Sequence, residues 1–481
     1  MKKRLFVTPA FLLGVFTMHA ATVIIQPDAV VKRNVKGASG ANLCYLLDSD
    51  KGYPRKIKTV EAVKAMGIGA LRFPYGHLAD NYLWTVPPFE DAPNGLKPRV
   101  ASMEYPPAKW NWAVDKNGVH TKSMDFDEYI ALCKETGIEP LVTVNVLSFQ
   151  YKGGPTREQL LESAVAWVHY ANVTRNYGVK YWQLGNEVEK QDGKSKLTKE
   201  LYSEIYGQMA AAMKRVDPSI KVGTGVLNKV DWNQIVLEQH PQLVDWVATH
   251  QYTWRIPLKT YDYKGWMEYQ DVYVPNVIRT QKLLDSNPEW KDIEILMTET
   301  NSKGAGVDWA DGNTSNLYKS LLFFEMNTEQ LASRSVKYTY FWSTHTPWSG
   351  EVVQGKPLDN LLDKDNNFTS QGQIVQLINH YLLPNILQVK KNEGYLRFRA
   401  SISDDGEEIT FFALNKGNQA DHVEFSVAGA AAYTLVEKIE FSGKSPQDQN
   451  PTVKKQTLKD SLKSLSSSLP PCSLTIFRVK K

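Results

Sequence analysis

Two glutamates lie where this sequence could carry out acid–base chemistry. Glu187 follows the short apolar run YWQL and the pair Gly185 and Asn186, and Glu299 lies within the run EILMTETN. An ionised carboxylate can act as a nucleophile, and a second carboxyl group kept protonated can donate a proton to a leaving oxygen. The pair predicts cleavage of a glycosidic bond, provided that the fold brings both side chains to one opening.

The elements that must position these glutamates are eight apolar, β-type segments that alternate with amphipathic helical patterns. The segments lie near residues 40, 72, 143, 184, 223, 249, 297 and 340. Most are continuous apolar runs, which is typical of parallel strands covered on the outside. Eight such units predict a (β/α)8 TIM barrel over residues 37–384. A doubly wound open sheet is the alternative, but no G-x-G-x-x-G opens the first helix.

Barrel geometry places the two glutamates at one end of the molecule. Side chains just past the carboxyl ends of parallel strands project into a shared mouth. Glu187 follows the fourth predicted strand and Glu299 lies at the end of the seventh. We therefore expect the two carboxyl groups to face each other across the mouth of the ring.

The C-terminal part of the chain has a different pattern of apolar and polar residues. From residue 385 onward, apolar and polar residues alternate between turn sequences such as Asp404-Asp405-Gly406. This pattern predicts an antiparallel β-sandwich over residues 385–481. Residues 22–36 are interpreted as a strand segment that can join the sandwich, and the Lys- and Ser-rich run 454–471 as a surface loop. The expected fold class is thus α/β, a barrel followed by a sandwich.

The N-terminal residues 1–21 have the pattern of a signal peptide. Three basic residues precede an apolar stretch and two alanines, and the stretch is too short to span a membrane. We therefore expect export to the periplasm or the extracellular space. The formal charge of +4 leaves no basic stripe for nucleic acid, and three scattered cysteines suggest neither a disulfide framework nor a zinc site. The oligomeric state is unknown at this stage.

Several motifs resemble clan A of the retaining glycoside hydrolases, which carry an acid/base Glu after Asn on strand four and a nucleophile on strand seven. Within the clan, LRFPYGHLADNYLW and THQY are similar to motifs of family 51, the α-L-arabinofuranosidases. The segment LNKGNQADHVEFSVAG is similar to the sandwich of that family. Tyr75 departs from the pattern, because the family usually has Gly there. Families 39 and 86, the xylosidases and agarases, are possible relatives.

The resemblance implies a role for each matching residue. Glu187 is the expected acid/base and Glu299 the expected nucleophile, with Tyr252 bonded to the nucleophile and Arg72 below it. The other residues expected to bind substrate are Asn145, Asn186, His250, Trp342, His77 and Trp254. Tyr263 and Trp266 are further candidates for stacking on sugar, whereas Glu189 and Lys190 are interpreted as solvated surface.

The expected function is a secreted retaining glycosidase that cleaves plant or algal polysaccharide by double displacement, as arabinofuranosidases do. Both catalytic groups are side chains, so the chemistry requires no metal or cofactor. One alternative is an endo-acting glycanase, because two long aromatic loops could form an extended cleft. Another is a sugar-binding barrel that lacks turnover.

Overall fold

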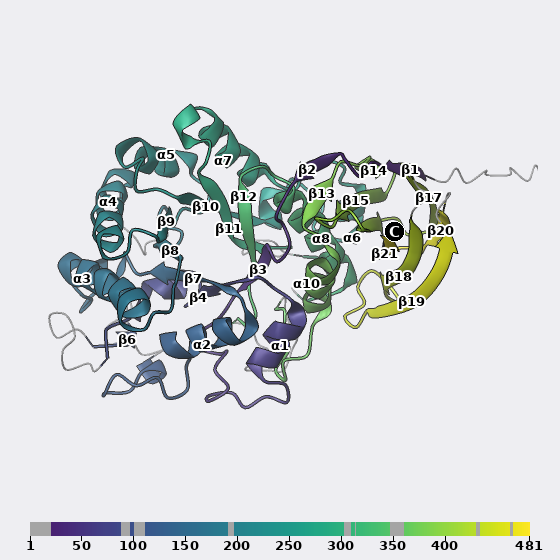
Figure 1. Ribbon diagram of the computed structural model, residues 1–481. Helices are drawn as coiled ribbons and strands as arrows, with labels where there is room; N and C mark the ends of the chain where they lie inside the picture. The colour runs from purple at the N-terminus through teal and green to yellow at the C-terminus, as the bar shows by residue number, and fades with distance from the viewer. Residues whose placement is uncertain are drawn as a thin grey trace, which may run out of the picture.

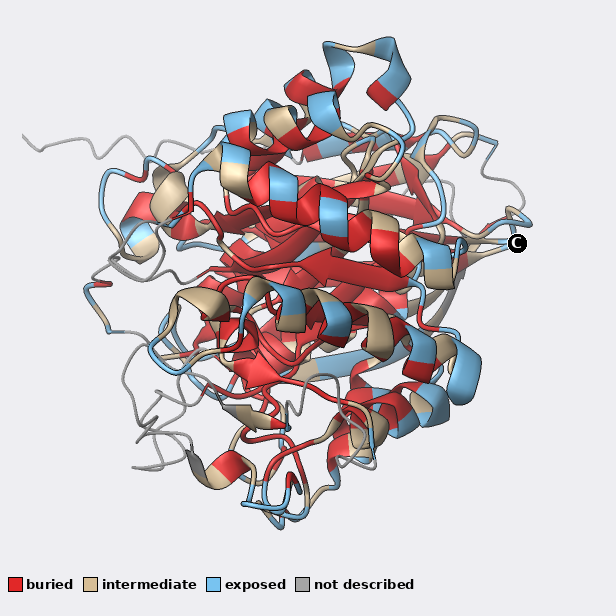
Figure 2. Cartoon of the chain, turned by 90° about the vertical axis from the view of Figure 1, so that its left-hand side faces the viewer, coloured by how far each residue is buried: buried red, intermediate tan, exposed pale blue. Residues whose placement is uncertain are grey.

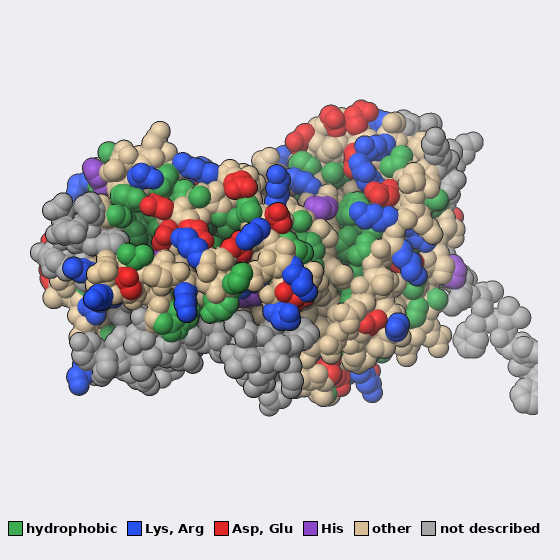
Figure 3. Space-filling model, turned by 90° about the horizontal axis from the view of Figure 1, so that it is seen from below, with side chains coloured by type: hydrophobic (Ala, Val, Ile, Leu, Met, Phe, Trp, Pro, Cys, Tyr) green, Lys and Arg blue, Asp and Glu red, His purple; other side chains and the backbone are tan. Residues whose placement is uncertain are grey.

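The computed structural model describes residues 21–87, 97–100, 111–190, 197–302, 309–312, 314–346, 360–429, 433–461 and 465–481. The chain forms two bodies, a barrel and a β-sandwich, which Figures 1 and 3 show side by side. The predicted signal peptide, apart from Ala21, lies outside the described residues. On the face seen in Figure 3, acidic and basic side chains are interspersed. None of the described helices combines the length and hydropathy needed to cross a bilayer.

The first body is a closed barrel of eight strands, and every pair of neighbours in it is parallel. All eight predicted strands are confirmed. In ring order they are β3 (Ser39–Asn42), β4 (Ala70–Phe73), β7 (Glu139–Val144), β8 (Tyr181–Leu184), β9 (Lys221–Thr224), β10 (Trp246–Tyr252), β11 (Glu294–Asn301) and β12 (Val336–Phe341). Because the order follows the chain, Glu187 on the fourth strand and Glu299 on the seventh reach the same mouth.

Helices surround the barrel, and those facing the viewer in Figure 2 carry both buried and exposed residues. α8 is the exception, because all but one of its residues are buried. Their N-terminal caps are mostly side chains that accept from the first turn, such as Asp125 and Thr198. The helices are α1 (Thr59–Met66), α2 (Phe126–Thr136), α3 (Arg157–Val168), α4 (Lys199–Val216), α5 (Val230–Gln239), α6 (Tyr263–Glu268), α7 (Pro275–Asp285), α8 (Leu317–Leu331) and α10 (Ser370–Tyr381).

The second body packs a three-stranded sheet against a larger one around a shared apolar core. The small sheet is β1 (Ala21–Ile25), β17 (Asp421–Val427) and β20 (Leu465–Leu469). The large sheet is β19 (Thr452–Ser461), β18 (Thr434–Ser442), β21 (Ser473–Lys480), β16 (Glu408–Asn415), β15 (Leu396–Ile402), β13 (Asn385–Leu387) and β2 (Val30–Lys32), with β14 (Asn392–Glu393) paired to β15. Two N-terminal strands therefore belong to the C-terminal body.

One sequence interpretation is wrong. The run 454–471 is not a surface loop, because it lies mostly in β19 and β20, which pair with β18 and β17. Both are edge strands of their sheets, and an edge strand can turn lysine and serine side chains to solvent. Leu469 at the end of β20 is fully buried. This apolar position indicates a strand, but the polar composition of the rest of the run favoured a loop.

A buried polar cluster joins the two bodies. Glu325 on α8 is 1% exposed and accepts from Arg397 Nε on β15 at 3.0 Å. Its other oxygen lies 3.2 Å from Nζ of Lys416 and accepts from Trp266 Nε1 at 2.7 Å. Burial lowers the pKa of Lys416 to about 8, and the charge of Glu325 opposes this shift. One buried carboxylate therefore neutralises two buried cations at the interface.

We predict that Glu325→Gln lowers the free energy of unfolding by about 3 kcal/mol, because it leaves two buried cations without a counter-charge. Urea denaturation followed by circular dichroism measures the change. Glu204→Gln, which removes the solvent-exposed partner of Arg157, is the control and should unfold close to the wild-type midpoint. Identical midpoints for wild type and the Glu325 variant would contradict the prediction.

Candidate active site

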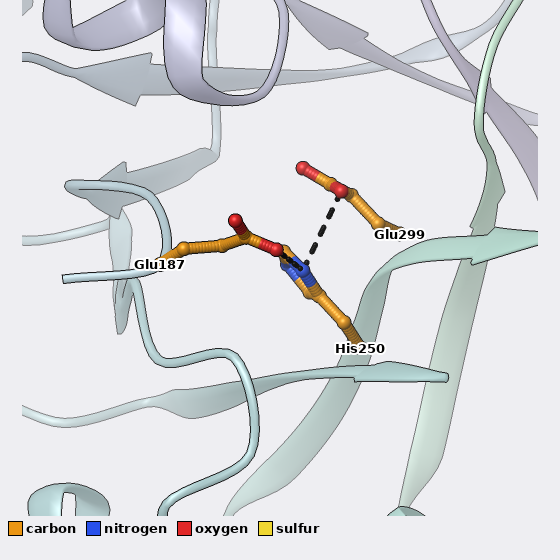
Figure 4. Close-up of side chains that lie close together, drawn as sticks. All are labelled: Glu187, His250 and Glu299. Atoms are coloured by element: carbon orange, nitrogen blue, oxygen red, sulfur yellow. Dashed lines mark hydrogen bonds and ion pairs between the residues drawn. The ribbon is translucent and has the colours of Figure 1, made fainter. Parts of the chain in front are cut away.

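The two glutamates face each other at the mouth of the barrel, with His250 between them (Figure 4). One carboxylate oxygen of Glu187, one of Glu299 and a ring nitrogen of His250 all lie within 4.8 Å of one another. Retaining glycosidases hold their two carboxyl groups about 5–5.5 Å apart, whereas inverting enzymes need a wider gap for water. The observed spacing fits the retaining arrangement.

A bulge on β11 sets the position of Glu299. Met297 pairs with Thr249 of β10, but Glu299 pairs with His250, so Thr298 has no counterpart on β10. An extra residue of this kind re-aims the side chains that follow it. His250 and Glu299 consequently lie level with each other, and Nε2 of His250 is 3.0 Å from the Thr298 hydroxyl. The spacing of the sequence motifs does not reveal this shift.

The turn after β8 positions Glu187. Gly185 has φ +81°, and Glu187 itself has φ +48°, which is uncommon for a residue with a side chain. A Cβ atom at Gly185 would lie 2.5 Å from the Val188 side chain, so glycine is required on steric grounds as well. Left-handed backbone at a non-glycine residue costs about 1 kcal/mol or more and is often found at functional sites. Here it directs the carboxyl group into the mouth.

Glu299 receives a hydrogen bond on each oxygen. Nη1 of Arg72 donates to Oε1 at 3.2 Å, and the Tyr252 hydroxyl donates to Oε2 at 2.6 Å. Burial raises the pKa of Tyr252 well above its usual value, and the charge of Glu299 adds to the effect, so Tyr252 remains a donor. A cation and a neutral donor favour the ionised carboxylate, as a nucleophile requires.

Glu187 has a different environment. Nδ1 of His250 lies 3.1 Å from Oε1, and Nζ of Lys190 lies 3.0 Å from Oε2. Burial alone would raise the pKa of Glu187, but the hydrogen bond and charge of His250, together with Lys190, lower it. The imidazole nitrogen is within hydrogen-bond reach of this carboxyl group, so the contact orients Glu187 in the mouth.

One expectation for the turn after Glu187 is wrong. Glu189 is not at the solvated surface: it is 3% exposed, and its oxygens accept from the backbone N–H groups of Leu227, Asn228 and Lys229. Lys190 is half exposed, as expected, and its Nζ also contacts Glu187. The run of polar residues in this turn does not indicate that the Glu189 carboxylate is buried.

Asn186 lies beside the two glutamates. Its Oδ1 accepts from Nη2 of Arg72 at 2.6 Å, whereas its buried Nδ2 has no hydrogen-bond partner in the structure. A buried donor without a partner is costly unless a ligand satisfies it. This geometry matches the expectation that the amide donates to a sugar hydroxyl.

An aromatic wall stands next to the nucleophile. The rings of Tyr75 and Trp342 have centroids 4.1 Å apart, and Trp342 is half-buried. A Cβ atom at Gly76 would lie 2.4 Å from Oε1 of Glu299 and 2.5 Å from the Trp342 ring, so only glycine allows this approach. Tyr75, which departs from the family pattern, is fully buried and bonds the Ser343 hydroxyl at 2.9 Å.

Two further predicted substrate-binding residues, Asn145 and His77, differ in their contacts and exposure. The Asn145 amide donates to the carbonyls of Asp80 and Tyr82, and its oxygen accepts from residues 147 and 148. No donor remains for a sugar, so this expectation is corrected: Asn145 holds the loop after β4. His77 begins the short helical turn of that loop, next to Gly76, and is partly exposed.

The loop aromatics mostly do not reach the mouth. Trp266 is fully buried against Glu325, and the Tyr263 hydroxyl donates to the Lys416 carbonyl, so neither is free to stack on sugar as expected. Trp84 stacks on Trp167 in the core. The remaining candidate is Trp254, which is partly exposed. Sequence alone could not distinguish these rings, because aromatic residues serve cores and ligands alike.

The same site could in principle hold a metal ion, with one ligand atom each from Glu187, His250 and Glu299. Arg72 and Lys190 contact the same two carboxylates and already neutralise them. A bound metal ion would have to compete with both positive charges. The donor set therefore fits acid–base chemistry better than metal binding.

Comparisons with known proteins agree with this geometry. Residues 62–270 match the family model of the α-L-arabinofuranosidase 1 domain, a segment that includes Glu187 but not Glu299. α-L-Arabinofuranosidase C of Emericella nidulans is 29% identical over 209 residues, 40% of this chain and 36% of its own. An intracellular exo-α-(1→5)-L-arabinofuranosidase of Streptomyces lividans is 24% identical over 281 residues, 52% of this chain and 39% of its own.

The solved structures agree on the fold. An α-L-arabinofuranosidase of Thermotoga maritima superposes with a TM-score of 0.73 at 19% identity, covering 96% of this chain and all of its own. The expected barrel with a C-terminal sandwich is confirmed, as is the resemblance to the arabinofuranosidases. The matches to the first two curated relatives span only 36% and 41% of those proteins' own lengths.

We predict that Lys190→Gln raises the pKa of Glu187, because the substitution removes a positive charge that stabilises the ionised carboxylate. An NMR titration of labelled glutamate carboxyl groups measures the shift, with Glu187→Gln to assign the resonance. Lys180→Gln, just before the opposite end of β8, is the control and should leave the titration unchanged. An unchanged titration in the Lys190 variant would show that the contact does not persist in solution.

Proposed function

We propose that this protein, a relative of the α-L-arabinofuranosidases of clan A, is a retaining glycoside hydrolase acting on plant or algal polysaccharide or oligosaccharide. The observation that carries the proposal is the pair of facing carboxylates within 4.8 Å, each in a different environment. One is held by Arg72 and Tyr252, and the other lies within hydrogen-bond distance of His250 and Lys190. The names of the relatives support release of an arabinofuranosyl unit.

The first half-reaction follows from these contacts. A carboxylate oxygen of Glu299 attacks the anomeric carbon while the bond to the leaving oxygen breaks. Glu187, in its protonated form, gives its proton to that oxygen, so the leaving group departs as an alcohol. The free Nδ2 of Asn186 donates to the sugar, a contact that strengthens as positive charge develops on the ring.

The second half-reaction reverses the roles. Glu187, now ionised, takes a proton from water, and the oxygen of that water attacks the anomeric carbon of the glycosyl-enzyme. Glu299 leaves as a carboxylate, which Arg72 and Tyr252 stabilise at once. Two displacements on the same carbon give a product with the configuration of the substrate.

Export is a further part of the proposal. The basic and apolar pattern of residues 1–21 supports it, and these residues lie almost entirely outside the described part of the chain. N-terminal sequencing of protein recovered from outside the cytoplasm tests it, and an N-terminus that retains residues 1–21 would refute it.

We predict that Glu299→Ala lowers kcat on p-nitrophenyl α-L-arabinofuranoside by about 10⁴-fold or more, because no other described group is placed to attack the anomeric carbon. Steady-state release of nitrophenol measures the loss, and proton NMR of the earliest product should show retained configuration. Glu135→Gln, an exposed change on α2, is the control. A Glu299 variant that kept most activity would rule out the nucleophile, and binding without turnover by the wild type would favour a non-catalytic barrel.

The second candidate is an endo-acting glycanase, because the loop after β4 could still wall a cleft. Against it, the loop after β10 is tied to the sandwich through Tyr263 and to α8 through Trp266, so it is not free to form the other wall. We therefore predict that monosaccharide is the only early product from polysaccharide, as chromatography of the first time points would show. Early oligosaccharide ladders would instead identify an endo-enzyme.

A further inference from the structure

Two arginines near the mouth have no acidic partner in the described part of the chain. Arg255 lies three residues after Tyr252, and Arg279 lies on α7, which packs beside β10 (Figure 1). The hydrogen-bond acceptors of both are amides: Asn228 for Arg255 in the orientation that satisfies the amide, and Asn276 for Arg279. Among the described residues, therefore, neither guanidinium makes an ion pair.

The two arginines border a hollow of about 470 Å³. Its walls are Trp254, Arg255, Val272, Pro275, Ile278 and Arg279. The guanidinium carbon of Arg255 lies 3.6 Å from the centroid of the Trp254 ring, so the side chain is held by stacking as well as by Asn228. The hollow combines an aromatic ring, aliphatic side chains and two cations.

The electrostatics of this hollow favour an anion. Burial lowers the pKa of Arg255, and the positive charge of Arg279 lowers it further, so the two guanidinium groups repel each other. The only carboxylate that opposes this shift is Glu189, which is already occupied by three backbone N–H groups. An anion placed between the arginines would relieve the repulsion and gain two charge-assisted interactions.

A short series of contacts links the hollow to the turn that carries Glu187. Glu189, two residues after Glu187, fixes the backbone of Asn228, and Asn228 in turn holds Arg255. Trp254 is two residues from Tyr252, so their Cα atoms are at most about 7 Å apart. The leaving oxygen must approach Glu187, so the sugars that carry it extend toward this side.

We propose that the hollow is a subsite for an acidic sugar in the leaving part of the substrate, next to the unit that is released. The anion is a uronate carboxylate or a sulfate ester, bound by Arg255 and Arg279 while the sugar ring packs on Trp254. The inference rests on the proposed function and narrows its substrate to charged glycans.

The test compares matched oligosaccharides that carry the same releasable arabinofuranosyl unit. One has a neighbouring uronate, the second is its carboxyl-reduced neutral counterpart, and the third carries a sulfate ester. The wild type should show a kcat/KM about tenfold higher on an anionic than on the neutral substrate, and added salt should lower this ratio. Preference for the uronate or for the sulfate identifies the source of the anion.

The variants assign the preference to the arginines. The ratio should fall close to one in Arg255→Gln/Arg279→Gln, whereas Arg279→Lys, which keeps the charge, should retain part of it. Arg334→Gln removes an exposed ion pair with Asp285, the last residue of α7, and should leave the ratio unchanged. Equal kcat/KM values on anionic and neutral substrates in the wild type, or a preference that survives the double substitution, would overturn the proposal.

Failure of the proposed function can be distinguished from failure of the subsite. If the wild type cleaves neither p-nitrophenyl α-L-arabinofuranoside nor the oligosaccharides, the glycosidase proposal fails. Calorimetric titration with a uronate-bearing oligosaccharide that lacks the releasable unit then tests the hollow alone. Binding that is lost in Arg279→Gln supports the subsite, and absence of binding to the wild type overturns it.

Discussion

The arrangement of the mouth depends on one buried charge, the guanidinium of Arg72. It is fully buried inside the barrel, where an unpaired cation would be prohibitively costly. Its N–H groups are satisfied by Asn42, Thr143, Gln183, Asn186 and Glu299, which lie on or just after four other strands of the ring. The same cation therefore cross-links these strands and bonds the carboxyl group of Glu299, so stability and the position of the nucleophile share a single constraint.

Around that centre, two chemically identical residues acquire different tasks from their neighbours. Glu299 accepts from the guanidinium of Arg72 and the hydroxyl of Tyr252, whereas Glu187 contacts an imidazole and an ammonium group. His250 also lies 3.5 Å from Glu299, so the imidazole is close to both carboxylates. The bulge at Thr298 brings Glu299 level with His250.

The sandwich takes part in the active site indirectly. Its Lys416 and Arg397 neutralise Glu325 and bind the loop that follows β10, the strand that ends with Tyr252. Much of the aromatic content of this loop serves the interface between the two bodies rather than the substrate. Trp254 is partly exposed and stacks on Arg255 instead, in the hollow that also includes Arg279.

The sequence by itself determined the eight barrel strands, the sandwich and the identity of the facing glutamates, because apolar periodicity and strand-end position are local properties of the chain. It also indicated Arg72 and Tyr252, through motifs at strand ends. Only the tertiary structure decided that the Asn145 amide donates to backbone carbonyls, that Trp266 lies in the core, and that Glu189 is buried. Those outcomes depend on hydrogen bonds and packing between residues far apart in the chain, which no local pattern encodes.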